Sequence, residues 1–197
     1  MPESRKERKH KAGCLFMLFP LLVFLGAVSA ADDYSRQEAQ KVIGLIGRIL
    51  EEQSEAAAGG MRKVVLTESE LNSYIAYRVE EEHSEIMREL RLKIFPGRRL
   101  EGKIYIDLRG QDLPKILKPE MNFYFDGTLE IRDNLFRLNL SSLYLENQKI
   151  LPELLNTVIY LGSKIQGSEP FRLDDWFELP YGIKNVETEL GRAVFHY

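Results

Sequence analysis

Apolar residues recur at helical spacing after the first thirty or so residues of the chain. Between residues 35 and 53 they stand three or four positions apart, which predicts an amphipathic helix. A second helix is predicted to start at Thr67, because Thr67 and Glu70 have the spacing of a capping box. Leu66 and Leu71 flank this start in the positions of a hydrophobic staple. Two helices therefore come before any strand signal.

After His83 the apolar period changes to two, which is typical of β-strands that bury one face. The alternation is interrupted by Pro96 with Gly97 and by Asp133 with Asn134, and each pair predicts a tight turn. The turns divide the segment into two hairpins. Their strands are predicted at residues 90–94, 100–108, 123–131 and 135–145.

The apolar side chains of the strand at 135–145 change parity halfway along it. A β-bulge at Ser141 and Ser142 would keep both groups on the buried face, and it would bend the sheet. A third, strongly apolar helix is predicted to begin at Pro152, which suits the first helical position, and to stop at Gly167. The chain then returns to strand.

The last residues predict a final hairpin that turns near Gly191. Taken together, the elements predict an α+β fold. Its centre would be a curved antiparallel sheet of about six strands, with amphipathic helices packed on the concave face. An N-terminal signal or anchor segment would precede this fold.

The first thirty residues have the pattern of a secretory signal peptide. Five basic residues precede an apolar run at 14–27, and the small residues before Ala31 suit cleavage between Ala30 and Ala31. The alternative is an uncleaved anchor that ties the protein to the inner membrane, since residues 14–31 approach the length of a span. Either way the rest is predicted to be periplasmic or otherwise extracytoplasmic. The predicted divisions are a signal or anchor segment, a helix with its linker, and one α+β domain, at residues 1–30, 31–60 and 61–197.

Charge and cysteine content narrow the classes of partner. The 197 residues carry a net charge of −3, and removing residues 1–30 takes away five basic and two acidic residues, which leaves an excess of six acidic ones. A nucleic-acid-binding protein normally shows a basic surface instead, so no nucleic-acid partner is expected. The single cysteine, Cys14, lies in the apolar run, and the exported part must therefore fold without a disulfide.

No motif of a catalytic or metal site is present in the sequence. The cluster of acidic residues around His83 matches no metal-ligand spacing, and a solvated helix end explains it equally well. The serines lack the glycines of a nucleophile elbow, and no glycine-rich phosphate loop occurs. We therefore expect no enzyme activity, no cofactor and no metal.

Two hypotheses of different class remain. In the first, the bent sheet and the helices enclose a groove for a lipid or another apolar ligand. The residues predicted to bind it are Tyr74, Ile75, Phe123, Phe125, Leu138, Leu140, Val158 and Ile159. In the second, the same side chains close a dry core, and the protein is a non-catalytic assembly or interaction protein of the cell envelope. The amphipathic helix at 35–53 would then dock an envelope protein or the membrane.

Three segments carry a resemblance to a known group of proteins. They are the LTESELNSY run at 66–74, the KILP run that opens the third helix at 149–152, and the LPYGI run at 179–183 before the last hairpin. With the paired strands between them, this order resembles small exported bacterial proteins related to tubular lipid-binding (TULIP-like) domains, over residues 64–197. The resemblance implies a long helix in a highly curved sheet, and lipid handling at the cell envelope.

Overall fold

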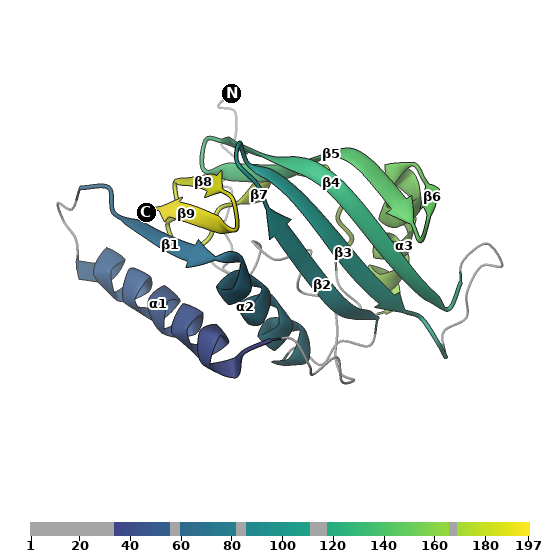
Figure 1. Cartoon of the computed structure of the whole chain (residues 1–197), viewed down its shortest axis with the longest axis horizontal. Helices are drawn as coiled ribbons and strands as arrows, with labels where there is room; N and C mark the ends of the chain where they lie inside the picture. Colours follow the sequence, from purple (N-terminus) through teal and green to yellow (C-terminus); the bar gives the residue numbers. More distant parts are fainter. Residues whose placement is uncertain (1–33, 56–59, 82–85, 111–117, 166–168) are drawn as a thin grey trace, which may run out of the picture.

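The computed structural model describes residues 34–55, 60–81, 86–110, 118–165 and 169–197 (Figure 1). These residues form an α+β fold with three helices and two antiparallel sheets, and the larger sheet is curled. The predicted fold class is therefore confirmed. The predicted signal segment and its cleavage point lie outside the described residues. No helix within the described ranges has both the length and the apolar character that crossing a bilayer requires.

The larger sheet contains the two predicted hairpins. Its strands are β2 (Met87–Ile94), β3 (Arg99–Asp107), β4 (Glu120–Arg132), β5 (Leu135–Leu145) and β6 (Gln148–Lys149), in that order, and β7 (Phe177–Glu178) pairs with β5. Both predicted turns are confirmed. Gly97 and Arg98 have φ of 75° and 63°, and Asp133 and Asn134 have φ of 51° and 61°, which is the left-handed backbone that such hairpin turns require.

The predicted bulge in β5 is also confirmed, and it bends the sheet. Ser142 pairs with Asp126 and Leu140 pairs with Gly127, so Ser141 is the extra residue. A second adaptation lies at Gly102 in β3, where a Cβ atom would stand 2.2 Å from the Phe125 ring. Only glycine leaves room for this ring against the inner face.

A second, smaller sheet lies across one end of the larger one (Figure 1). It consists of β1 (Lys63–Thr67), β9 (Arg192–His196) and β8 (Asn185–Glu189), in that order. The hairpin of β8 and β9 was expected from the sequence. The strand β1 was not, and it pairs with β9 from the opposite end of the chain.

The three helices are α1 (Arg36–Glu55), α2 (Glu68–Glu81) and α3 (Pro152–Ile165). The capping box at the start of α2 is formed as predicted. The Thr67 backbone N–H donates to a Glu70 carboxylate oxygen at 2.8 Å, and the Glu70 N–H donates to Thr67 Oγ1 at 3.2 Å. Leu66 and Leu71 pack in the same apolar cluster, as the predicted staple requires.

The main core lies between the inner face of the larger sheet and two helices. Phe123 and Leu143 from the sheet are fully buried, and Val158 from α3 packs against the same cluster. Ile75 from α2 joins this cluster from the side of β2. Both α2 and α3 therefore cover one face of the sheet, which leaves the outer face polar.

The free edge of β2 is sealed by side chains of α2. Asn72 donates from Nδ2 to the Leu92 carbonyl at 2.8 Å, and its Oδ1 accepts the Leu92 N–H at 2.8 Å. Glu68 accepts the Ile94 N–H at 2.8 Å. The amide of Asn72 thus replaces the neighbouring strand that an edge residue lacks.

Asn72→Ala is expected to lower the free energy of unfolding by about 1–3 kcal/mol, because it leaves two partly buried backbone groups of Leu92 without partners. Urea denaturation followed by circular dichroism measures the change. Gln40→Ala, at an exposed position of α1, is the control and should stay within about 0.5 kcal/mol of the parent. Equal stability of the two variants would contradict the role of Asn72.

A buried carboxylate lies at the end of β3. Asp107 accepts hydrogen bonds from the Arg109 Nε at 2.9 Å and the Arg109 Nη2 at 2.6 Å, and Arg88 Nε lies 3.6 Å away. The hydrogen bonds from Arg109 lower the pKa of Asp107 to about 2, against the opposing effect of burial. The ionised form of Asp107 therefore stabilises the fold.

The folded pKa lies below the ordinary value, so this stabilisation is complete above about pH 4 and is lost as the pH falls toward 2. Asp107→Asn should remove it, lowering stability at pH 7 by on the order of 1 kcal/mol and flattening the acid dependence below pH 4. Urea midpoints measured from pH 7 to pH 2 test this. Asp133→Asn, in an exposed turn, should keep the parental acid dependence.

Candidate functional site: an apolar cavity

An apolar cavity of about 250 Å³ lies where the small sheet faces the larger one, and it is partly open to solvent. Its wall is almost wholly carbon. The inner face of β2 to β5 supplies one side, β1, β8 and β9 the opposite side, and α1 and α2 a third. The segment from Leu173 to Ile183, which contains β7, completes the wall.

One end of the cavity is closed by a polar seam between the two sheets. The Thr188 hydroxyl donates to the Phe95 carbonyl at 2.6 Å and accepts the Arg98 N–H at 2.6 Å. The Arg98 side chain also donates to the Val186 carbonyl at 2.8 Å and to Asn185 Oδ1 at 2.8 Å. We call this set of contacts the β8 seam. It joins the tip of the β2–β3 hairpin to the free edge of β8.

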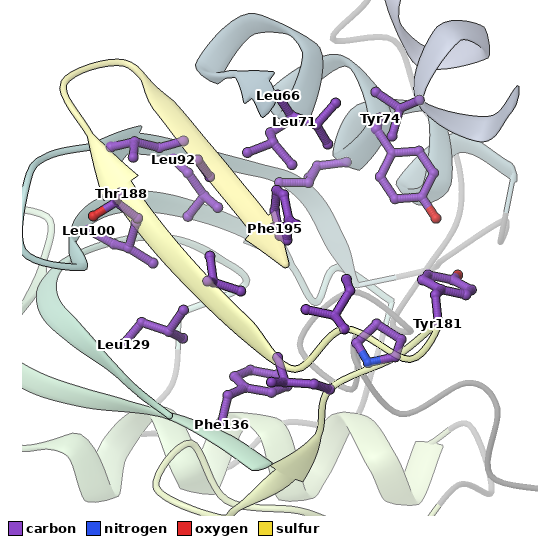
Figure 2. A pocket seen from close by; sticks show the side chains of 18 of the residues that line it. Leu66, Leu71, Tyr74, Leu92, Leu100, Leu129, Phe136, Tyr181, Thr188 and Phe195 are labelled. Atoms are coloured by element: carbon purple, nitrogen blue, oxygen red, sulfur yellow. The ribbon is translucent and has the colours of Figure 1, made fainter. Parts of the chain in front are cut away.

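The opposite end lies near two tyrosines. Figure 2 shows Tyr74 and Tyr181 on one side of the cavity, and Leu100, Leu129 and Thr188 on the other. Tyr181 stands in a turn with φ of 51°, next to Gly182 with φ of 64°, and this turn leads from β7 into β8. The cavity therefore extends from the β8 seam toward the tyrosines.

The helix α1 contributes Val42, Leu45, Ile46 and Ile49 to the wall. Its apolar face thus points inward, as amphipathic spacing predicts for a helix that covers an apolar surface. The outer side carries polar residues, together with the partly exposed Ile43. In this structure the apolar face of the helix that was proposed to dock a partner or the membrane is turned toward the cavity.

Polar contacts to α2 hold α1 in place. Glu38 accepts hydrogen bonds from the hydroxyls of Ser69 at 2.7 Å and Ser73 at 2.9 Å, and Lys41 forms an ion pair with Glu70. Burial opposes the charge of Glu70, but the hydrogen bonds from Lys41 and from the Thr67 N–H outweigh it and lower its pKa. Glu70 therefore both caps α2 and anchors α1.

The eight predicted ligand-binding residues fall into two groups. Tyr74, Ile75, Phe125 and Leu138 line the cavity. The other four, Phe123, Leu140, Val158 and Ile159, lie in the core that packs α3 against the sheet. No residue of α3 is among those that line the cavity. The cavity is therefore not beneath the third helix, where the predicted binding residues Val158 and Ile159 lie. The space beneath α3 is closely packed, because Phe123 and Val158 are fully buried in the same core cluster.

Several lining residues were missed by sequence reasoning. Ala193 and Phe195 of β9, Val64 and Leu66 of β1, and the face of α1 supply much of the wall. The helical spacing in α1 marked its apolar face as buried, but Ala193, Val194 and Phe195 are consecutive apolar residues that do not show which face of β9 is covered. The sequence pattern could not show that α1 and β1, early in the chain, meet β9 at its end.

None of the described side chains that line the cavity is charged. Of the side chains that line it, only Tyr74, Tyr181 and Thr188 contain a polar atom, and the Thr188 hydroxyl is already engaged in the β8 seam. Within the described part of the chain, no group of three or more histidine, cysteine, aspartate or glutamate residues is placed to hold a metal ion. The predicted acidic cluster at 80–85 lies mostly outside that part. The cavity's chemistry is that of hydrocarbon contact.

Two matched leucine truncations separate the cavity wall from the closed core. Leu143→Ala, in the core, should lower the free energy of unfolding by about 3–5 kcal/mol. Leu129→Ala, in the cavity wall, should cost about 1–2 kcal/mol, because its side chain borders a void and loses fewer contacts. Chemical denaturation of both variants checks the difference. Equal losses would mean that the wall is packed like the core.

Comparisons of the chain with protein-family models, with curated protein sequences and with solved structures found no match. The cavity's geometry and the pattern of the N-terminal residues are therefore the features that bear on function.

Proposed function

We propose that the protein is exported to the cell envelope and binds a lipid or another apolar ligand there. The observation that carries this proposal is the cavity of about 250 Å³, whose wall contains no charged side chain and whose opening reaches solvent. Soluble domains normally fill their interiors to the density of organic crystals. The void is slightly smaller than the pockets of about 300–1,000 Å³ that hold drug-sized ligands, and its apolar wall, supplied by ten strands and helices, suits a small apolar group.

The size of the cavity sets the binding energy it can provide. A methylene group occupies about as much space as a water molecule in the liquid, about 30 Å³, so the cavity holds about eight of them. At about 0.8 kcal/mol for each buried methylene, the gain is on the order of 6 kcal/mol. The gain would correspond to a dissociation constant of some tens of micromolar, and this is the tightest binding that the cavity alone can give, because association also costs translational and rotational freedom. Contacts of the ligand's polar group would add to this.

The proposed location has a separate basis, which is the basic and apolar pattern of residues 1–30. The first described helix begins at Arg36, a few residues after the predicted cleavage point. A protein placed at the outer surface of a membrane in this way would meet lipids during its normal function. The resemblance to tubular lipid-binding domains supports the same proposal.

Native mass spectrometry of the full chain, expressed with its own N-terminus and isolated separately from membranes and from the periplasmic fraction, tests the proposal. We expect adducts with the mass of a lipid or fatty acid, and a polypeptide mass that shows whether cleavage follows Ala30. Competition against N-phenyl-1-naphthylamine, a fluorescent apolar probe, measures binding in solution. A protein without any adduct that also fails to bind the probe, and that captures a specific envelope protein instead, would overturn the proposal in favour of an assembly role.

Neighbouring valines on β1 provide matched variants. Val64 lines the cavity, whereas Val65 is 47% exposed on the other face of the strand. Val64→Thr, which keeps the size of the side chain and adds a hydroxyl to the apolar wall, should weaken probe binding about threefold to tenfold. Val65→Thr should leave it unchanged. Equal effects, with both variants folded by circular dichroism, would place the binding site elsewhere.

A further inference from the structure

We infer that the ligand has a single unbranched hydrocarbon chain, of which about eight carbons enter the cavity, with its polar group left outside near Tyr181, at the end away from the β8 seam. This inference rests on the proposed function and specifies the class of ligand. Its basis is the cavity's volume, its closed end and the absence of available polar groups inside it.

The volume limits the ligand to one chain. About 250 Å³ accommodates about eight methylene groups, and a second chain of similar length would need twice that space. The surrounding wall is fixed on several sides. Ile94, Val186 and Ala193 are all buried and belong to one packed cluster between the two sheets. A lipid with two long tails therefore does not fit into the cavity without separating the sheets.

The direction of entry follows from the two ends. At the β8 seam, hydrogen bonds from Thr188 and Arg98 join the sheets, and Gly191 N–H donates to the Ile94 carbonyl at 2.9 Å. Separating the sheets there would expose these bonded groups. At the other end, Tyr74 of α2 is buried, whereas Tyr181, in the turn before β8, is partly exposed (Figure 2). The chain's terminal methyl group therefore lies toward the seam.

The polarity of the wall excludes ligands with polar groups along the chain. Thr188 is the only hydroxyl at the closed end, and its donor and acceptor functions are both engaged. A hydroxyl or amide inside the cavity would lose its hydrogen bonds to water and find no replacement. The polar group of the ligand must therefore remain at the mouth.

A series of saturated fatty acids from six to sixteen carbons tests this inference by competition with N-phenyl-1-naphthylamine, below their aggregation concentrations. Each added methylene should tighten binding about fourfold while it enters the cavity. Beyond the filled length, added carbons stay in water and the affinity should become constant. A plateau at about eight to ten carbons supports the inference. A steady increase through sixteen carbons overturns it while leaving the proposed function standing.

A second comparison varies the number of tails at a constant head group. Octylphosphocholine and dioctanoylphosphatidylcholine share the phosphocholine group and tails of eight carbons, but the second has two tails. The single-chain compound should bind at least tenfold more tightly. Equal or tighter binding of the two-tailed compound overturns the inference.

Variants at the closed end should move the plateau in opposite directions. Ala193 pairs with Thr188 across β8 and β9, so Ala193→Leu adds three carbons to the wall next to the seam. It should shorten the optimal chain by about three carbons, and Ala193→Val, a smaller change, by about two. Leu129→Ala removes three carbons from the wall and should lengthen the optimum by about the same number.

The control is Val65→Leu, which enlarges a side chain on the outer face of β1 and should leave the plateau in place. Circular dichroism identifies variants that fold. If folded Ala193→Val and Leu129→Ala bind the probe but keep the parental plateau, the closed end is not at the seam and the inference fails. If no fatty acid of any length displaces a bound probe, the inference fails, whereas the proposed function itself fails if neither the probe nor any fatty acid binds.

Discussion

The way in which the two sheets meet determines the rest of the structure. Hydrogen bonds of Thr188 and Arg98 connect β8 of the small sheet with the tip of the β2–β3 hairpin of the larger one. Next to this seam, apolar side chains of both sheets pack in one cluster that includes Ile94 and Val186. The helix α1 covers the third side of the cavity through its contacts with α2. The cavity thus lies between two apolar surfaces that polar bonds hold together at one end.

The features that the sequence predicted correctly depend on residues close together in the chain. The capping box joins Thr67 to Glu70 within one helical turn, and the turn at Asp133 and Asn134 involves two adjacent residues. The bulge at Ser141 follows from a change of parity within one strand. Such patterns have local physical causes, so reading them needs no knowledge of the partner surface.

The location of the cavity could not be predicted in the same way. Periodicity identifies the face of an element that is buried, but not the surface that covers it. Val158 and Val42 have similar signals in the sequence, yet Val158 fills the core beneath α3 while Val42 borders the void beneath α1. The pairing of β1 with β9 is the decisive event, since it brings Val64 opposite Phe195 from the far end of the chain. No short-range pattern encodes that pairing, which explains why half of the predicted site residues belong to the closed core.

A closed apolar void of this volume would be costly for a protein of this size. Measured costs of closed cavities, about 24 cal/mol for each Å³, give at most on the order of 6 kcal/mol for 250 Å³, because this cavity is partly open to solvent. This limit is similar to the gain calculated for burying about eight methylene groups, since both figures scale with the same hydrocarbon volume. It is also comparable with the whole stability of a small domain, about 5–15 kcal/mol. A ligand that fills the void would give the wall new contacts, and mass action would then stabilise the folded state. This coupling between filling the void and stabilising the fold is the physical basis of the proposal that the ligand is a hydrocarbon chain.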